Sequence, residues 1–278
     1  MTDPRLTPAR GDVAAAHLKG KVTAARFLDG VAHQLKHGVS ALRETPSLSG
    51  RLETQLLRGE MFTVYDEAGG WLWGQNVSDL YVGYARADGF AAAIEMMTHR
   101  VCALRTIIFP APDIKAQPHE FLSLNAKVCV KAIDGRFASL EGGGFVIAAH
   151  LAPLAGRAPD WVAVAEMFLH TPYLWGGKDS FGVDCSGLVQ ASLEAGGIAA
   201  PRDSDMQEAA LGSAVAFDSA ALKRGDLVFW QGHVGIMADW RDLVHASGHH
   251  MRVVIEPLAD AAARIAPSDG PVTSVRRV

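Results

Sequence analysis

Short apolar runs interrupted by turn residues fill the first half of the chain. Between residues 39 and 85 these runs are rich in Val, Leu, Trp and Tyr, and glycine or proline separates them. Short strands with closely spaced turn signals indicate a small β-barrel. We expect the residues before it to pack beside the barrel as an N-terminal extension.

A second copy of this pattern follows the first. Residues 39–43, VSALR, reappear as residues 101–105, VCALR, and the turn at 69–71 has a counterpart at 142–145. Internal similarity of this kind indicates two modules of one fold. The domain bounds that we predict, from the extension through the two β modules to a C-terminal domain, are 1–37, 38–90, 97–154 and 160–278.

The apolar spacing becomes helical after Asp184. Leu188, Val189 and Leu193 recur on one face of the predicted helix, and Gly196 is in a position to end it. An aspartate directly before such a segment is a common N-cap residue. We therefore predict a helix that begins at Cys185.

Cys185 occupies the first turn of that helix. The free N–H groups and the helix dipole at this position favour a thiolate, which is the reactive form of cysteine. Cys102 and Cys129 lie in apolar, strand-like runs, where burial explains a cysteine. Cys185 lies in a turn between polar residues, so we interpret it as a nucleophile.

Two histidines follow about fifty residues later. His233 and His245 flank a predicted hairpin turn at residues 239–241. If the strands pair symmetrically about Asp239, the two imidazoles face each other on one side of the sheet. His233 would then accept the thiol proton, and His245 would orient the His233 ring.

A zinc site is the alternative interpretation of the same three residues. One thiolate and two imidazoles form a possible ligand set. However, the sequence has no C-x-x-C pair and no H-E-x-x-H helix near Cys185. The ligand spacing therefore favours catalysis, and we expect neither a metal nor another cofactor.

Four motifs in order resemble the NlpC/p60 family of cysteine peptidases. They are residues 171–177 (TPYLWGG), 184–189 (DCSGLV), 224–229 (RGDLVF) and 233–236 (HVGI). The resemblance covers about residue 160 to the C-terminus. It implies a papain-like α+β domain with Cys185 as nucleophile, His233 as base and His245 as the third polar residue.

The two β modules resemble bacterial SH3-like (SH3b) domains. The expected fold class is therefore α+β, with two SH3-like barrels before the catalytic domain. This arrangement is similar to dipeptidyl-peptidase VI type enzymes, γ-D-glutamyl-L-diamino acid endopeptidases that recognise a free N-terminal L-Ala on murein peptides. The resemblance implies a substrate role for Tyr81, although Leu80 stands where the pattern often has Gly. Glu44 is a candidate for the peptide's ammonium group.

Other substrate-binding candidates surround the nucleophile. By the same resemblance they are Tyr173, Trp175, Asp184, Ser186, Asp203 and Ser204. Asp203 offers a carboxylate to the L-Ala amine, and the serines offer hydroxyls to the D-Glu carboxylate. Asp203 can equally cap a helix that follows it, and a barrel tyrosine or a loop glutamate commonly has only a packing or solvated role.

Charge and composition narrow the partners and the compartment. The formal net charge of −4 gives no basic patch, so we expect no nucleic-acid or membrane partner. No apolar stretch of signal-peptide length occurs near the N-terminus, and three cysteines give no disulfide framework. We expect a cytoplasmic protein whose substrate is an imported murein tripeptide or tetrapeptide. Arg276 and Arg277 are interpreted as solvated terminal charges.

Two other functions remain open from the sequence. A peptidoglycan-binding SH3b module would keep the barrels but would not need Cys185, His233 and His245. An acyltransferase would use the same thioester chemistry and pass the acyl group to an acceptor other than water.

Overall fold

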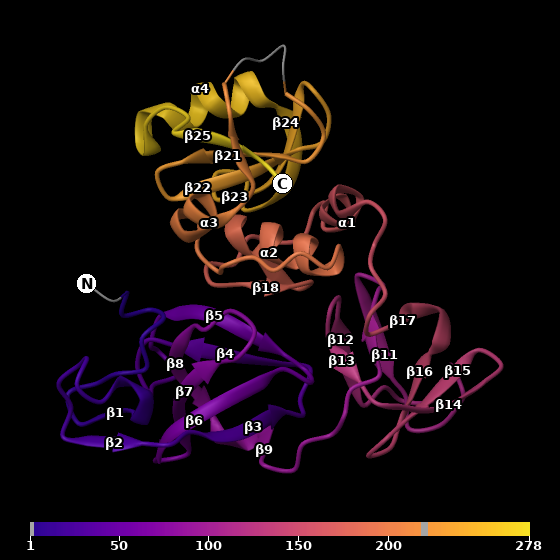
Figure 1. Cartoon of the computed structure of the whole chain (residues 1–278). Helices are drawn as coiled ribbons and strands as arrows, with labels where there is room; N and C mark the ends of the chain where they lie inside the picture. Colours follow the sequence, from indigo (N-terminus) through magenta and orange to yellow (C-terminus); the bar gives the residue numbers. More distant parts are fainter. Residues whose placement is uncertain (1–2, 218–221) are drawn as a thin grey trace. The chain divides into compact units, whose positions relative to one another are not determined.

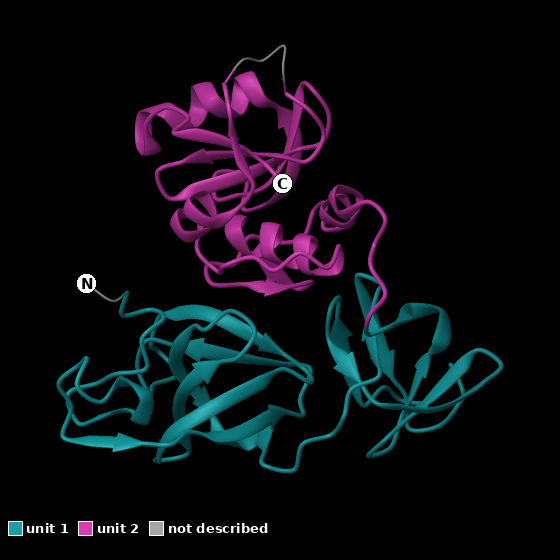
Figure 2. Ribbon diagram, in the orientation of Figure 1, with its two compact units in different colours: residues 1–154 teal, residues 155–278 magenta. Residues whose placement is uncertain are grey.

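The computed structural model describes residues 3–217 and 222–278 and divides into two compact units, Met1–Leu154 and Ala155–Val278 (Figures 1 and 2). The first unit is built of strands and short 3-10 turns. The second mixes helices with an antiparallel sheet. The fold class is therefore the expected α+β, with the helices confined to the C-terminal unit.

The first unit begins with a short parallel pair. Strands β1 (Val13–Ala15) and β2 (Arg26–Leu28) are joined through the turn η1 (Ala16–Leu18). Just before β1, Arg10 donates to Asp66 at 2.5 Å, and its guanidinium carbon lies 4.5 Å from the centre of the Trp73 ring. These contacts tie the N-terminal residues to the sheet that follows.

That sheet has seven antiparallel strands in the order β5-β4-β8-β7-β6-β3-β9. They are β3 (Val31–Leu35), β4 (Val39–Arg43), β5 (Leu52–Leu57), β6 (Met61–Ala68), β7 (Trp71–Asn76), β8 (Val82–Arg86) and β9 (Phe90–Ala91), with η2 (Ala87–Gly89) before β9. Alternate side chains, including Leu42, Phe62 and Leu72, form the core. The strand β3 belongs to this sheet although it lies within the segment that we expected as an extension.

A second β region completes the first unit. It has three small antiparallel sheets, β13-β10-β17, β11-β12 and β14-β15-β16. The strands are β10 (His99–Val101), β11 (Arg105–Ile108), β12 (Glu120–Ser123), β13 (Lys127–Val128), β14 (Val130–Asp134), β15 (Phe137–Leu140), β16 (Phe145–Ile147) and β17 (Leu151–Pro153), with η3 (Ala148–His150) before β17. Its core joins Val101, Leu122 and Val146 to Leu57 of β5. The two β regions therefore share apolar contacts.

The second unit has a six-stranded antiparallel sheet in the order β20-β25-β21-β22-β23-β24. Its strands are β20 (Ser213–Val215), β21 (Asp226–Trp230), β22 (His233–Met237), β23 (Asp242–Ser247), β24 (Arg252–Pro257) and β25 (Ser274–Arg277), and a small separate pair is formed by β18 (Lys178–Asp179) and β19 (Gly182–Val183). The helices are α1 (Trp161–Met167), α2 (Cys185–Ala195), α3 (Ser204–Ala210) and α4 (Leu258–Asp269).

Helices α2 and α4 cover opposite faces of this sheet (Figure 1). Leu258 and Ile265 of α4 pack on Trp230, Met237 and Leu243. Because side chains alternate along a strand, His233 lies on the same face as Met237, and His245 on the same face as Leu243. The fold thus brings both histidines to the side of the sheet that α4 covers.

The hairpin between β22 and β23 corrects the expected register. Ile236 pairs with Val244 and Met237 with Leu243, so the pairing is centred on Trp240 rather than on Asp239. When the centre of a hairpin moves by one residue, each residue is paired with a residue two positions further along the other strand. The side chains of that strand therefore stay on the same face of the sheet. His245 is therefore a diagonal neighbour of His233 instead of its direct partner, still within reach of a ring.

The C-terminal arginines also differ from expectation. Arg276 and Arg277 belong to β25, which lies between β20 and β21. Arg277 donates to both carboxylate oxygens of the buried Asp226, at 2.7 and 2.6 Å. The buried Asp226 carboxylate needs a charged partner, and Arg277 supplies it from β25.

Candidate active site

Cys185 is the first residue of α2, as the sequence predicts. The Asp184 carboxylate caps the helix by accepting the Gly187 N–H at 2.7 Å. The Cys185 side chain is nearly covered, with 7% of the residue exposed, and its sulfur accepts the backbone N–H groups of Ser186 and Val234. Since Val234 follows His233 in β22, the thiol lies beside the strand that carries the first histidine.

Burial controls the ionisation of this thiol. It raises the pKa of Cys185 to about 12, and the negative charge of Asp184 acts in the same direction. The two backbone N–H groups lower the pKa, as expected at a helix start, but burial outweighs them. In the free protein Cys185 is therefore a protonated thiol at neutral pH.

The two histidines form a chain of hydrogen bonds with a carboxylate. His233 Nε2 and His245 Nδ1 are 2.8 Å apart, and His245 Nε2 lies 2.8 Å from Glu256 Oε1. The two rings meet edge to face, with centroids 5.0 Å apart. The structure thus brings His233 and His245 together and adds Glu256, a residue of β24 that the sequence patterns did not reveal.

Both imidazoles are neutral at physiological pH. Burial lowers the pKa of His233 to about 3, with further contributions from His245 and Arg264. Burial also lowers the pKa of His245, although the hydrogen bond with Glu256 opposes that shift. A neutral imidazole has one nitrogen lone pair, so His233 is in the protonation state that a general base requires.

A cavity of about 330 Å³ opens beside the histidines. Its walls include Tyr173, Trp175, His233, His245 and Arg264, and the Trp175 ring is largely exposed. Burial raises the pKa of the Tyr173 phenol, and the neighbouring Cys185 and Asp184 add to this. Two of the predicted substrate residues, Tyr173 and Trp175, therefore line a space next to the predicted base.

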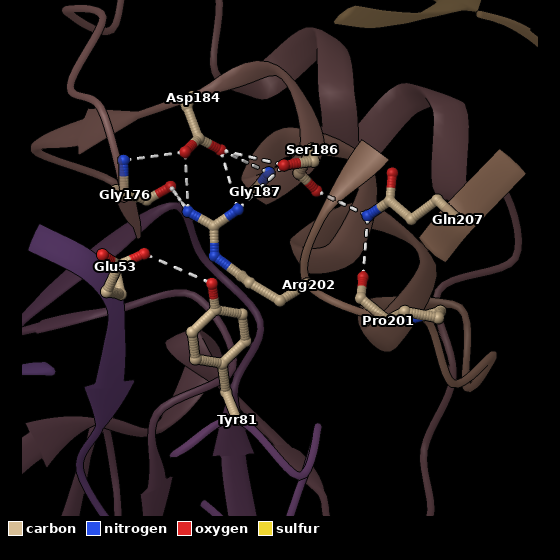
Figure 3. A network of polar contacts seen from close by, with 10 residues as sticks. Glu53, Tyr81, Gly176, Asp184, Ser186, Gly187, Pro201, Arg202 and Gln207 are labelled. Carbon is tan, nitrogen blue, oxygen red and sulfur yellow. Dashed lines mark hydrogen bonds and ion pairs between the residues drawn. The ribbon is translucent and has the colours of Figure 1, made fainter. Parts of the chain in front are cut away.

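Asp184 and Ser186 belong to a buried polar network under the start of α2 (Figure 3). Arg202 donates to Asp184 Oδ1 at 3.0 Å, to Asp184 Oδ2 at 2.7 Å and to Ser186 Oγ at 2.8 Å. The Gly176 N–H donates to Asp184 Oδ2 at 2.8 Å. Both carboxylate oxygens therefore have partners within the protein.

Helix α3, which begins shortly after Arg202, contacts the start of α2 through a side chain. Asp203 precedes α3 and accepts the Gln207 N–H through its carbonyl, but its carboxylate makes no capping bond to the helix. Ser204 is the first residue of α3. Gln207 Nε2 donates to the carbonyls of Ser186 at 2.9 Å and Pro201 at 2.8 Å (Figure 3).

The two candidates in the first unit have different surroundings. Tyr81 is buried in the core of the seven-stranded sheet, and its hydroxyl donates to Glu53 Oε2 at 3.3 Å (Figure 3). Glu44 is exposed and lies 3.7 Å from Arg51. Leu80 has a φ of 64°, a left-handed conformation that explains why glycine suits this position.

Sequence comparisons identify domains in both units. Residues 170–264 match the NlpC/P60 family, and residues 42–89 match the bacterial dipeptidyl-peptidase Sh3 domain. The chain contains an NlpC/P60 domain and a bacterial SH3 domain. This confirms the resemblance that the four motifs and the first β module indicated.

Curated relatives resemble this chain over different lengths. A γ-D-glutamyl-L-lysine dipeptidyl-peptidase of Bacillus cereus is 28% identical over 246 residues, which are 76% of this chain and 72% of that protein. A protein of the same name from Bacillus subtilis is 37% identical over 99 residues, which are 33% of this chain and 32% of that protein.

Solved structures support the fold. An NlpC/P60 family protein from Bacillus cereus superposes with a TM-score of 0.73 at 22% identity, over 88% of this chain and 99% of that one. An NlpC/P60 endopeptidase from Photobacterium damselae gives a TM-score of 0.63 at 13% identity, over 88% of this chain and 71% of that one. These superpositions show that the chain shares its fold with NlpC/P60 proteins.

Over residues 3–217 and 222–278, no group of three or more His, Cys, Asp or Glu side chains is arranged to hold a metal ion. Within the same residues, no helix has the length and apolar character needed to cross a membrane.

Proposed function

We propose that this NlpC/P60 protein is a cysteine peptidase that cleaves murein peptides with a free N-terminal L-Ala. The scissile bond is the amide between the D-Glu side-chain carbonyl and an L-diamino acid, either meso-diaminopimelate or lysine. The observation that carries the proposal is the hydrogen bond between His233 of β22 and His245 of β23, next to a cysteine whose sulfur contacts the N–H of Val234, also in β22. The names of the Bacillus relatives support the bond type.

The reaction begins from a neutral thiol and a neutral imidazole. As the Cys185 sulfur bonds to the substrate carbonyl carbon, its proton passes to His233, and the carbonyl oxygen becomes an oxyanion. His233 then gives the proton to the leaving amine as the C–N bond breaks, which leaves a thioester. Water, deprotonated by His233, attacks the thioester and releases the L-Ala-γ-D-Glu dipeptide and the thiol.

Positioning of the substrate and of the oxyanion donors must supply much of the rate enhancement. Burial disfavours the thiolate, so proton transfer has to accompany attack rather than precede it. Enzymes lower barriers by about 8 kcal/mol or more, and oriented donors at the oxyanion commonly supply the largest share. We propose the Cys185 N–H, at the start of α2, as one such donor.

Substrate contacts form the finer part of the proposal. Around the cavity we assign Tyr173 and Trp175, and near the nucleophile Asp203 and Ser204, to the peptide. In the internal network Asp184 and Ser186 act through the position of α2, because their polar atoms are already paired. The family resemblance supports two further contacts, Tyr81 and Glu44 of the first unit, to the L-Ala amine.

Recognition of a free amine also bears on where the protein works. L-Ala has a free amine in a released murein peptide, which supports imported tripeptides or tetrapeptides in the cytoplasm as the substrate pool. Cell fractionation with an antibody to the protein tests this. Recovery only outside the cytoplasm would contradict it.

The test of function is cleavage of L-Ala-γ-D-Glu-meso-diaminopimelate and of its L-Lys analogue by the full chain. We expect release of the dipeptide, loss of release in Cys185→Ala, and retained release in the matched variant Cys102→Ala. Equal cleavage of an N-acetylated peptide would refute recognition of the free amine. Tight peptide binding without cleavage would favour a binding module, and transfer of the dipeptide to an added amine in preference to water would favour an acyltransferase.

A further inference from the structure

Glu256 connects the two histidines to a fixed cation on α4. Its Oε1 lies 2.8 Å from His245 Nε2, and the same carboxylate forms an ion pair with Arg264. His250 Nε2 is 3.7 Å from the other oxygen. In the β23–β24 ladder His245 pairs with Val254, so Glu256 is its diagonal neighbour on the same face.

The chemistry of the carboxylate decides which nitrogen of His245 carries hydrogen. The hydrogen bond with His245, and after it Arg264, lowers the pKa of Glu256 to about 2, so the group is an anion at neutral pH and can only accept hydrogen bonds. His245 Nε2 must therefore be the protonated nitrogen. Because His245 is neutral, its Nδ1 has a lone pair and is an acceptor.

The same constraint passes to His233. Its Nε2 lies 2.8 Å from the acceptor nitrogen of His245, so His233 Nε2 must carry the hydrogen in this bond. The remaining nitrogen, His233 Nδ1, is then unprotonated. This is the tautomer in which His233 can accept a proton through Nδ1 from a thiol.

We propose that Glu256, held by Arg264, is a positioning residue that fixes the tautomers of His245 and His233 and leaves His233 Nδ1 as the base. This inference rests on the proposed peptidase function for its kinetic consequence, but its structural part does not. Without the carboxylate, His245 is free to protonate Nδ1 and turn its lone pair away from His233. His233 would then lose the acceptor that orients it.

The carboxylate also has an electrostatic effect during the reaction. When His233 accepts the thiol proton, it becomes an imidazolium next to His245, and the negative charge of Glu256 lies behind that ring. The other charged or titratable groups that contact Glu256 in the described residues are Arg264, which opposes this effect, and His250. The Glu256 anion partly offsets the repulsion that Arg264 exerts on the imidazolium.

The experiment compares Glu256→Gln with the matched variant Glu166→Gln in the full chain. Glu166 also pairs with an arginine, Arg224, at 2.5 Å, but it lies in α1 and contacts neither histidine. We expect kcat to fall by about 10²-fold or more in Glu256→Gln, with KM changed less than about threefold, since loss of the correct tautomer affects the chemical step. Glu166→Gln should keep the wild-type kcat.

Nitrogen-15 NMR of histidine-labelled protein reads the tautomers without substrate. In the wild type we expect hydrogen on Nε2 of both His233 and His245, and in Glu256→Gln a new population with hydrogen on His245 Nδ1. The acidic limb of the pH profile, where His233 becomes protonated and can no longer act as a base, should shift less in Glu256→Asp than in Glu256→Gln, because aspartate keeps an acceptor-only group. Wild-type kcat in Glu256→Gln would overturn the inference.

The two proposals fail in different ways. If the wild type cleaves no murein peptide, the proposed function falls, and the NMR spectrum still decides the tautomers. If the wild type cleaves but its His245 carries hydrogen on Nδ1, the role of Glu256 falls and the peptidase stands. If Glu256→Gln does not fold, the wild-type spectrum alone still shows whether His233 and His245 carry hydrogen on Nε2, as the inference requires.

Discussion

Replacing Arg202 with methionine removes the cation that lies under the start of α2. The side chain is 1% exposed, and its two terminal nitrogens reach the two oxygens of Asp184 at 3.0 and 2.7 Å. Methionine fills much of the same volume but leaves the carboxylate without its ion-pair partner. Breaking a buried pair by removing one partner costs about 3–5 kcal/mol. Because hydrogen bonds from Gly176 and Gly187 remain, we expect about 3 kcal/mol.

The assay is amide hydrogen exchange of peptides from α2, followed by mass spectrometry in the full chain as urea is raised. This reports the opening free energy of the second unit without requiring that both units unfold together. The double variant Asp184→Asn/Arg202→Met should recover part of the loss, since it removes the unpaired charge. Arg241→Met is the matched control, because Arg241 is exposed and only 3.8 Å from Asp242, and it should cost less than about 1 kcal/mol.

Equal protection of the α2 peptides from exchange in Arg202→Met and in Arg241→Met would refute this expectation. A double variant that is less stable than Arg202→Met by the full cost of losing Asp184 would refute it as well. Either result would mean that the pair contributes little to holding the nucleophile's helix.

Two further changes test the packing and the titration of the same unit. Gly187→Ala places a Cβ against the carbonyl oxygen of Gly177, so we expect the free energy of unfolding, measured by urea titration, to fall by about 1–3 kcal/mol. Gly248→Ala is the control, because its Cβ meets open space, and its free energy of unfolding should stay within about 0.5 kcal/mol of the wild type. Equal stability of the two variants would refute the close approach at Gly187. Because burial lowers the pKa of His233 to about 3, its neutral form contributes stability that is complete above the ordinary value of about 6.5 and is lost as pH falls towards 3. His233→Asn should therefore lose less unfolding free energy than the wild type over that window, and parallel curves would show that this histidine is not buried in a neutral form.

The start of α2 was predictable because its signals are local. Asp184 caps the helix through Gly187, and the apolar spacing from Leu188 onward marks its buried face. The nucleophile's position follows from these few neighbouring residues. The α+β class and the order of the domains followed from motifs that are likewise contiguous in sequence.

The sequence predicted the faces of the β22–β23 hairpin but not its register. The sequence placed the histidines on one face correctly, since faces depend only on the parity of residue numbers. The centre of the turn depends on backbone geometry at Asp239 and Trp240, which the pattern does not fix. The histidines are therefore diagonal, although their hydrogen bond is still made.

Arg202 and Glu256 escaped the sequence analysis because their partners are distant in the chain. Arg202 meets Asp184 across 18 residues, and Glu256 meets His245 across 11. Neither lies in a motif, and each looks like an ordinary surface charge in its local context. A buried carboxylate at a helix start does require a partner, but only the fold identifies which arginine supplies it.

The most direct test of the account is to trap the covalent intermediate. The full chain is mixed with L-Ala-γ-D-Glu-L-Lys, quenched with acid and digested, and the peptides that contain Cys185, Cys102 and Cys129 are examined by mass spectrometry. The account predicts an L-Ala-γ-D-Glu acyl group on the Cys185 peptide alone, at early times, with its decay matching dipeptide release. Turnover at the wild-type rate with Cys185 replaced by alanine, or an acyl group on another cysteine, would contradict it.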